Sequence, residues 1–177
     1  MNNKYIFETE RLAARKFAPE DKERLYEIHR DDEVKKWIPG EYYEDLDEAG
    51  ESIEFFAERV ENKELPYVLA VVLKETGELI GDTGVNEVEG KPGEVEVGFV
   101  IGRDCRGKGY ATEVLKQMGD YITSIASSVK VLYGRVMKGN DASVRVLEKN
   151  GYVFEREEYG AEDDPYGNGM LVYRRSI

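Results

Sequence analysis

A glycine-rich turn near the middle of the chain holds two basic side chains, Arg106 and Lys108, beside Gly107 and Gly109. Glycine lets a ligand approach the main chain closely, and the free N–H groups and dipole at the start of a helix attract anions. The basic side chains add positive charge to the same place. The turn therefore predicts a phosphate-binding site.

The residues on either side of this turn predict the elements that position it. Apolar residues alternate from Val95 to Ile101, which is typical of a strand. After the turn, apolar residues recur at the spacing of one buried helix face, at Ala111, Val114, Leu115, Met118, Ile122 and Ile125. We therefore expect the turn to join a strand to the start of a helix.

Three known phosphate-binding patterns come close to this turn. A dinucleotide-binding fingerprint would need glycine or alanine where Thr112 stands. A Walker A loop fits from Gly102 to Lys108 but needs a magnesium-binding hydroxyl where Gly109 stands. The segment from Arg106 to Ala111 resembles Gln/Arg-x-x-Gly-x-Gly/Ala, the signature of the GNAT family of N-acetyltransferases, in which the turn amides grip the pyrophosphate of coenzyme A. A surface turn without a ligand is the alternative to all three.

Composition limits the classes of protein to consider. The chain has 177 residues and a formal net charge of −12, with Cys105 and His29 as its only cysteine and histidine. We expect one domain, residues 1–177, that binds no nucleic acid and favours a cationic substrate or partner. One cysteine, no apolar run of about 20 residues and no signal peptide predict a soluble cytoplasmic protein without a membrane partner. One histidine argues against a multi-histidine metal site, so we expect no metal.

Hydrophobic periodicity and turn residues divide the rest of the chain into short strands and helices. An acidic loop, residues 161–165, separates the last two strands, which we expect to form a hairpin. We expect strands at 7–16, 67–73, 79–88, 95–101, 129–137, 152–159 and 170–175, and helices starting near 18, 31, 45 or 47, 111 and 140. These elements predict one mixed α/β domain.

Three blocks in this order extend the family resemblance over most of the chain. They are Thr9-Glu10-Arg11-Leu12, the strand, turn and helix from Glu94 to Met118, and the segment from Asn140 to Phe154. Together they resemble the ribosomal-protein N-terminal acetyltransferase (RimJ/RimL-like) subgroup of GNAT enzymes. The resemblance implies an α/β (α+β mixed) GNAT-like fold with a mostly antiparallel, twisted sheet flanked by helices. Its fourth and fifth strands splay apart, and the pantetheine arm of the cofactor lies in the gap.

The resemblance also implies an activity, namely transfer of an acetyl group from acetyl-CoA to a primary amine by direct attack. The acceptor would be a protein N-terminus, a polyamine or another small amine, and the protein a monomer or homodimer. The residues implied to bind coenzyme A are Phe99, Val100, Ile101, Arg106, Gly107, Lys108, Gly109, Tyr110, Ala111, Thr112, Asn140 and Ser143. Helix capping is the alternative role for Asn140 and Ser143.

Acyl transfer to an amine requires a base, because a lysine amine has a pKa of about 10.4 and attacks only when unprotonated. Glu96 is the candidate by resemblance and Glu94 the second choice, with a solvated strand carboxylate as the alternative for either. An oxyanion would need a fixed donor, most plausibly the N–H of Phe99 or a neighbour. Ser143 would stabilise or protonate the leaving thiolate, since Leu147 stands where other branches carry a tyrosine acid.

Several further residues admit more than one interpretation. His29 is expected to be a surface or half-buried side chain in a helix, and Trp37 a packing residue. Cys105 could be a thiolate nucleophile beside arginines, or an incidental loop residue. The acceptor would be selected by loops at 41–45, 82–86 and 161–169. Two other functions stay open, a non-catalytic acyl-CoA sensor and a P-loop nucleotide hydrolase.

Overall fold

The structure is a computed structural model that describes residues 5–161, 167 and 169–177. Its helical elements are η1 (Pro19–Asp21), α1 (Lys22–His29), α2 (Asp32–Trp37), η2 (Pro39–Glu41), α3 (Leu46–Asn62), η3 (Arg103–Cys105), α4 (Tyr110–Ile125) and α5 (Asp141–Lys149). Its strands are β1 (Phe7–Glu8), β2 (Leu12–Arg15), β3 (Tyr67–Leu73), β4 (Leu79–Glu87), β5 (Glu94–Ile101), β6 (Val131–Met137), β7 (Val153–Glu158) and β8 (Met170–Ser176). No helix in these residues is long and apolar enough to cross a membrane.

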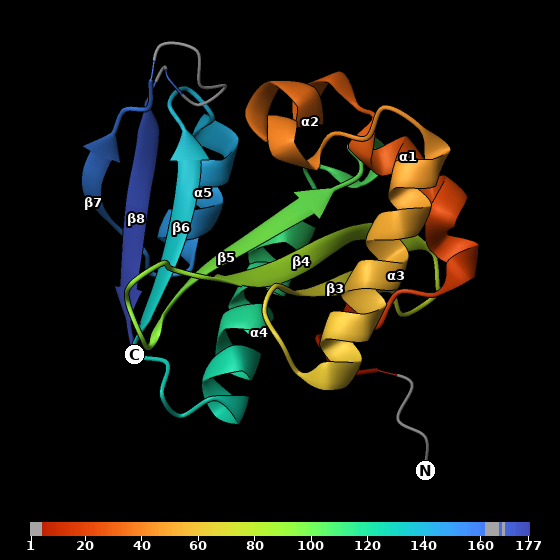
Figure 1. The fold of residues 1–177 in the computed structure, drawn as a ribbon, viewed down its shortest axis with the longest axis horizontal. Coiled ribbons are helices and arrows are strands. Elements are labelled where there is room, and N and C mark those ends of the chain that lie inside the picture. The colour runs from red at the N-terminus through yellow and green to blue at the C-terminus, as the bar shows by residue number, and fades with distance from the viewer. Residues whose placement is uncertain (1–4, 162–166, 168) are drawn as a thin grey trace.

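The strands form one sheet in the order β1-β2-β3-β4-β5-β6-β8-β7. Every neighbouring pair is antiparallel except β5 and β6, which run parallel and pair only at Glu94–Glu96 with Val131–Tyr133. Beyond Glu96 the two strands diverge, as Figure 1 shows. The expected mixed GNAT-like fold, including the splayed fourth and fifth strands of the sequence prediction, is confirmed.

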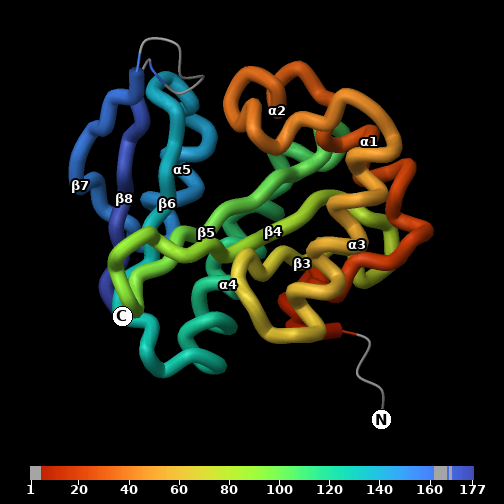
Figure 2. The backbone as a smooth tube through the Cα atoms, in the orientation of Figure 1, coloured from red at the N-terminus to blue at the C-terminus, as the bar shows by residue number. Residues whose placement is uncertain are grey.

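Helices cover both faces of the sheet. On one face, α1 packs on β4 and α3 on β3, and buried residues of α1, α2 and α3 form a core with Ala70, Val72 and Val100. On the other face, α4 packs against β5 through Val114, Leu115 and Met118. Figure 2 shows the backbone of α2 and α5 on either side of the opening between β5 and β6. Alternate residues of β5 thus belong to different layers.

The first predicted strand, 7–16, is wrong in one respect, because the structure divides it into β1 and β2. The main-chain N–H of Thr9 donates to the carbonyl oxygen of Leu12 at 2.8 Å, and the N–H of Leu12 donates to Oγ1 of Thr9 at 2.9 Å. The chain therefore turns back on itself, and Phe7 pairs with Ala14. Apolar and polar residues alternate on both sides of this turn. The alternation alone therefore cannot reveal where the chain turns back.

The other elements begin and end within a few residues of their predicted bounds. Of the two predicted caps for α3, Asp45 is the one used, because its carboxylate accepts from the N–H groups of Asp47 and Glu48. Gly151 adopts φ +78° directly after α5, as expected for a glycine stop. The last two strands form the predicted hairpin, but β8 and not β7 lies beside β6. Residues 162–165 of the acidic loop lie outside the described residues.

Candidate active site

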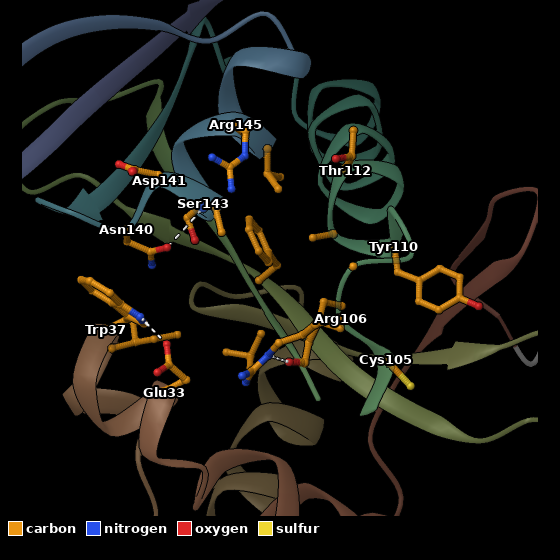
Figure 3. A pocket seen from close by; sticks show the side chains of 18 of the residues that line it. Glu33, Trp37, Cys105, Arg106, Tyr110, Thr112, Asn140, Asp141, Ser143 and Arg145 are labelled. Carbon is orange, nitrogen blue, oxygen red and sulfur yellow. Dashed lines mark hydrogen bonds between the residues drawn. The ribbon is translucent and has the colours of Figure 1, made fainter. Parts of the chain in front are cut away.

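A cavity of about 570 Å³ lies where the two splayed strands, α2, α5 and the start of α4 meet. Figure 3 shows Asn140, Ser143 and Arg145 on one side of it and Trp37, Glu33 and Arg106 on the other. Eleven of the twelve residues expected to bind coenzyme A line this cavity: Phe99, Val100, Ile101, Arg106, Gly107, Gly109, Tyr110, Ala111, Thr112, Asn140 and Ser143. The structure thus brings three separated segments of sequence together.

The glycine turn exposes main chain to this cavity. Gly107 and Gly109 have φ of +75° and +81°, in the left-handed region that favours glycine, and a Cβ on Gly107 would meet no atom within 4 Å. Gly109 is the N-cap of α4 and has no side chain to satisfy the first N–H groups of that helix. This arrangement suits an anion that accepts from Tyr110 and its neighbours.

The two basic side chains of the turn have different surroundings. Arg106 lines the cavity, while its Nε donates to the carbonyl oxygen of Ile101 at 2.8 Å and its Nη2 lies 3.2 Å from Oδ2 of Asp31. Lys108 is not among the lining residues, because its Nζ donates to the carbonyl oxygen of Asp104 at 3.1 Å. The turn therefore offers one charged group to the cavity rather than two.

The conformation of the turn is fixed from outside by a cluster that we call the clamp, made of Thr9, Arg11 and Glu113. Oε1 of Glu113 accepts from the hydroxyl of Thr9 at 2.5 Å and from the N–H of Arg11 at 2.9 Å. The guanidinium of Arg11 reaches Oε2 of Glu113 at 2.7 Å and donates to the carbonyl oxygen of Lys108 at 2.9 Å. The clamp gives the N-terminal Thr9-Glu10-Arg11-Leu12 block a physical role.

Burial alone would raise the pKa of Glu113, but the donors of Thr9 and Arg11 outweigh it and hold the pKa below its usual range. Glu113 is thus a stable carboxylate at the start of α4, where the helix dipole favours it. Sequence analysis missed Glu113. One sign of it was present in the sequence, because Thr9 and Arg11 are polar residues to which no partner was assigned. Their partner, Glu113, lies more than 100 positions away.

Helix α5 contributes the opposite wall. Oδ1 of Asn140 accepts from the N–H of Ser143 at 3.2 Å, so the capping role expected as an alternative is real. Among the described residues, none accepts from Nδ2 of Asn140 or bonds the hydroxyl of Ser143, which leaves both groups available to a ligand. Arg145 and Lys149 also line the cavity. Sequence analysis missed both, although their spacing of four on one helix face is a usable signal.

A second cavity, of about 260 Å³, opens on the face of the sheet that carries α1, α2 and α3. It shares Trp37, Ile38, Phe99, Val100, Asn140 and Ser143 with the first. Two of the shared residues, Phe99 and Val100, lie on β5 beyond its last pairing with β6. A reacting group beside them would be accessible from both cavities. Trp37, expected only to pack, thus contributes to the junction.

Glu96 lines the second cavity and Glu94 does not. The side chain of Glu96 is 31% exposed and lies 4.0 Å from the guanidinium of Arg135. Burial is the main cause that raises the pKa of Glu96, the charge of Glu158 adds to it, and Arg135 opposes it. Glu94 faces a different hollow and lies 3.6 Å from Nζ of Lys91. Of the two carboxylates, only Glu96 lines the cavity that adjoins the first.

His29 is not a surface or half-buried residue, as the sequence suggested, but is 1% exposed. Its Nε2 lies 2.6 Å from Oδ2 of Asp82 and its Nδ1 lies 2.6 Å from the carbonyl oxygen of Glu41. Both partners offer acceptor oxygens, so a proton on each ring nitrogen would satisfy both. Burial opposes this charge, but Asp82 and the Glu41 carbonyl outweigh it and raise the pKa of His29.

The proposed thiolate at Cys105 is not supported. The residue is 5% exposed, and burial together with the charge of Asp104 raises the pKa of its thiol. Leu147 is buried, and its methyl groups occupy the space beside Gly134 where a Cβ would lie. It offers no proton, as the sequence indicates. No group of three or more histidine, cysteine, aspartate or glutamate residues in the described chain could hold a metal ion.

Comparisons with known proteins identify the family of the chain. The family described as "Acetyltransferase (GNAT) domain" matches residues 11–153. The uncharacterized N-acetyltransferase p20 of Bacillus licheniformis is 30% identical over 151 residues, which cover 84% of this chain and 82% of that protein. A GNAT acetyltransferase structure from Bacillus anthracis superposes with a TM-score of 0.77 at 25% identity, covering 96% of each chain.

A third similarity concerns the fold alone. RimL, a ribosomal-protein alpha-N-acetyltransferase solved with coenzyme A, superposes with a TM-score of 0.82 at 14% identity, covering 98% of each chain.

The hypothesis of a P-loop nucleotide hydrolase is wrong, because the family match and the antiparallel sheet place the glycine turn in a different fold.

Proposed function

Because the chain belongs to the GNAT family of N-acetyltransferases, we propose that it transfers the acetyl group of acetyl-CoA to a primary amine by direct attack. The observation that carries this proposal is the meeting of two cavities on β5. One cavity has the features of a phosphate and pantetheine site, and the other holds Glu96. Donor and acceptor would thus reach the same atoms from two adjoining cavities.

The residues of the first cavity fit coenzyme A. The N–H groups at the start of α4, next to Gly107 and Gly109, would hold the pyrophosphate. The free edge of β5 from Phe99 to Ile101 would pair with the pantetheine like an added strand, and Nδ2 of Asn140 would donate to its amides. Arg145 and Lys149 add positive charge for the remaining phosphate. The bound thioester would supply the activated acyl group.

The proton chemistry falls to residues at the junction. Glu96 would accept the proton of the incoming ammonium, directly or through water, and its raised pKa makes it a stronger base than an ordinary glutamate. The N–H of Phe99 or a neighbour would donate to the oxyanion. The free hydroxyl of Ser143 would stabilise or protonate the leaving thiolate, since Leu147 cannot.

The family resemblance supports finer proposals. We propose that the protein belongs to the RimJ/RimL-like subgroup, and that residues 1–177 act as one N-acetyltransferase domain in the cytoplasm, as a monomer or homodimer. The acceptor would be a protein N-terminus, a polyamine or another small amine. The net charge of −12 supports a cationic acceptor.

The proposed base is tested by thiol release from acetyl-CoA across pH. Glu96→Gln should lower kcat/KM at neutral pH by about 100-fold, the range typical for loss of a general base, and leave the Kd of coenzyme A within about twofold. Glu94→Gln removes the same charge from the same strand and should leave kcat/KM within about twofold. An unchanged pH–rate profile in Glu96→Gln would contradict the assigned role.

A further inference from the structure

The floor of the second cavity is a pair of glycines. Gly84 of β4 and Gly98 of β5 are register partners, and a Cβ on Gly98 would meet no atom within 4 Å. Asp82 and Glu96 lie two positions away on the same face of the sheet, one on each strand and at opposite ends of this floor. The missing side chain of Gly98 leaves a trough over β5 between the two carboxylates, while Val68 packs over Gly84, where a Cβ would lie 2.9 Å from its Cγ2.

Each end of the trough carries a carboxylate. At one end, Glu96 lies 4.0 Å from the guanidinium of Arg135, which is held at 2.6 Å by Glu158. Glu158 also pairs with Arg156. At the other end, Oδ2 of Asp82 is bound by His29, while no described residue donates to Oδ1. Glu41 lines the cavity here as well, where burial raises the pKa of its carboxyl group and the charge of nearby Asp82 raises it further. Two carboxylates against one imidazolium leave a net negative charge at this end.

One wall between these ends is apolar, because Phe56, Pro66 and Val68 line that side of the cavity. The register places Asp82 four positions from Asn86, the partner of Glu96, so the two carboxylate-bearing residues are roughly 13 Å apart along the strands. A trough with an apolar wall and a carboxylate at each end matches a methylene chain with a cation at each end.

We propose that the acceptor is an unbranched primary amine with a second positive charge, an inference that rests on the proposed function. The reacting nitrogen would lie at Glu96 and the second cation at Asp82 and Glu41. An amino-terminal peptide fits less well, because the main-chain groups of the floor already pair between β4 and β5 and the cavity measures about 260 Å³. A peptide would bring amide groups without partners there.

The first test compares hexylamine with hexamethylenediamine, which differ only in the second charge. With acetyl-CoA at saturation, kcat/KM should be at least about 10-fold higher for the diamine. The double variant Glu41→Gln, Asp82→Asn should lower kcat/KM for the diamine at least about fivefold more than for hexylamine. Glu87→Gln, which removes a charge from β4 outside the cavity, should leave the ratio of the two substrates unchanged.

A second variant covers the case in which loss of Asp82 disturbs folding. Gly98→Val fills the trough where the structure has open space. It should lower kcat/KM for the diamine at least about 10-fold, with coenzyme A binding by calorimetry within about twofold of the original protein.

The outcomes separate this inference from the proposed function. No thiol release with any amine, or no coenzyme A binding, would overturn both. Equal kcat/KM for the two amines would overturn the second charge alone, and full diamine activity in Gly98→Val would overturn the trough as the place where the acceptor binds. Faster acetylation of an uncharged peptide with a free N-terminus would replace the diamine with a peptide acceptor.

Discussion

The two cavities meet at Phe99 and Val100 but are built from different groups. The first, which we assign to coenzyme A, presents main-chain N–H groups, two glycines in the left-handed region and the free edge of β5. The second, which we assign to the acceptor, presents carboxylates and apolar side chains over a glycine floor. Binding in the first therefore depends on backbone conformation, and binding in the second on the charge and size of side chains.

This difference predicts how substitutions act. A side chain added to the glycine turn changes both the conformation and the space that a phosphate needs. A charge removed from the second cavity leaves the backbone as it is and changes which amine is preferred. Each cavity can then be altered without the other, and the predictions below test that independence.

The largest effect is expected from Gly109→Glu. The substitution places an L side chain at φ +81° and a carboxylate at the helix start that an anion would occupy. Binding of coenzyme A, measured by calorimetry, should weaken at least about 100-fold, which corresponds to about 2.8 kcal/mol.

Gly77→Glu is the matched control for this prediction. Gly77 has φ +75° in the turn between β3 and β4, with no atom within 4 Å of its Cβ position, so the strain and the added charge are similar. Its coenzyme A binding should stay within about twofold. Equal loss in both variants would mean that strain or net charge, and not the phosphate site, is responsible.

The same difference explains what the sequence could predict. Phosphate-binding turns are local, so the glycines, the preceding strand and the following helix are readable from one stretch of about 25 residues. The second cavity depends on register, because Asp82 and Glu96 come together only when β4 pairs with β5. Periodicity predicts that both strands exist but does not specify which residues become neighbours on one face.

His29 shows the limit most clearly. Its neighbours in α1 are charged, which predicts an exposed position, whereas its partner Asp82 is 53 positions away on β4. The clamp could not be predicted for the same reason, since Glu113 and Thr9 are 104 positions apart in the sequence. In both cases the polar partners lie on elements that tertiary packing brings together, and a single sequence contains no local sign of them.

A moderate effect is expected from the clamp, which lies outside the first cavity. Glu113→Gln removes the charge that holds Arg11 and, through it, the carbonyl of Lys108. Hydrogen bonds to charged groups contribute about 1.5–3 kcal/mol, part of which the amide retains. Coenzyme A binding should weaken about 5-fold to 10-fold, while the preference between hexylamine and hexamethylenediamine stays the same.

Glu8→Gln provides the comparison for the clamp. Glu8 lies on β1 and pairs with Lys74 at 3.3 Å, with 47% of its side chain exposed. An exposed pair of this kind contributes little, so coenzyme A binding should not change measurably. A change of amine preference in Glu113→Gln would show that the two cavities are coupled through the turn.

The smallest effect concerns the imidazolium beneath the second cavity. Asp82 and the Glu41 carbonyl raise the pKa of His29 above its unfolded value of about 6.5. The stabilisation is therefore fully present below about pH 6.5 and is lost as pH rises through the folded pKa. The difference in Tm between the original protein and His29→Gln should shrink between pH 6 and pH 9, by about 2–4 °C for each 1 kcal/mol lost. Contributions from groups that do not interact with His29 cancel in this difference, so parallel curves would contradict the assignment. Coenzyme A binding of His29→Gln should stay within about twofold, because the ring contacts β4 and the Glu41 loop and does not line the first cavity.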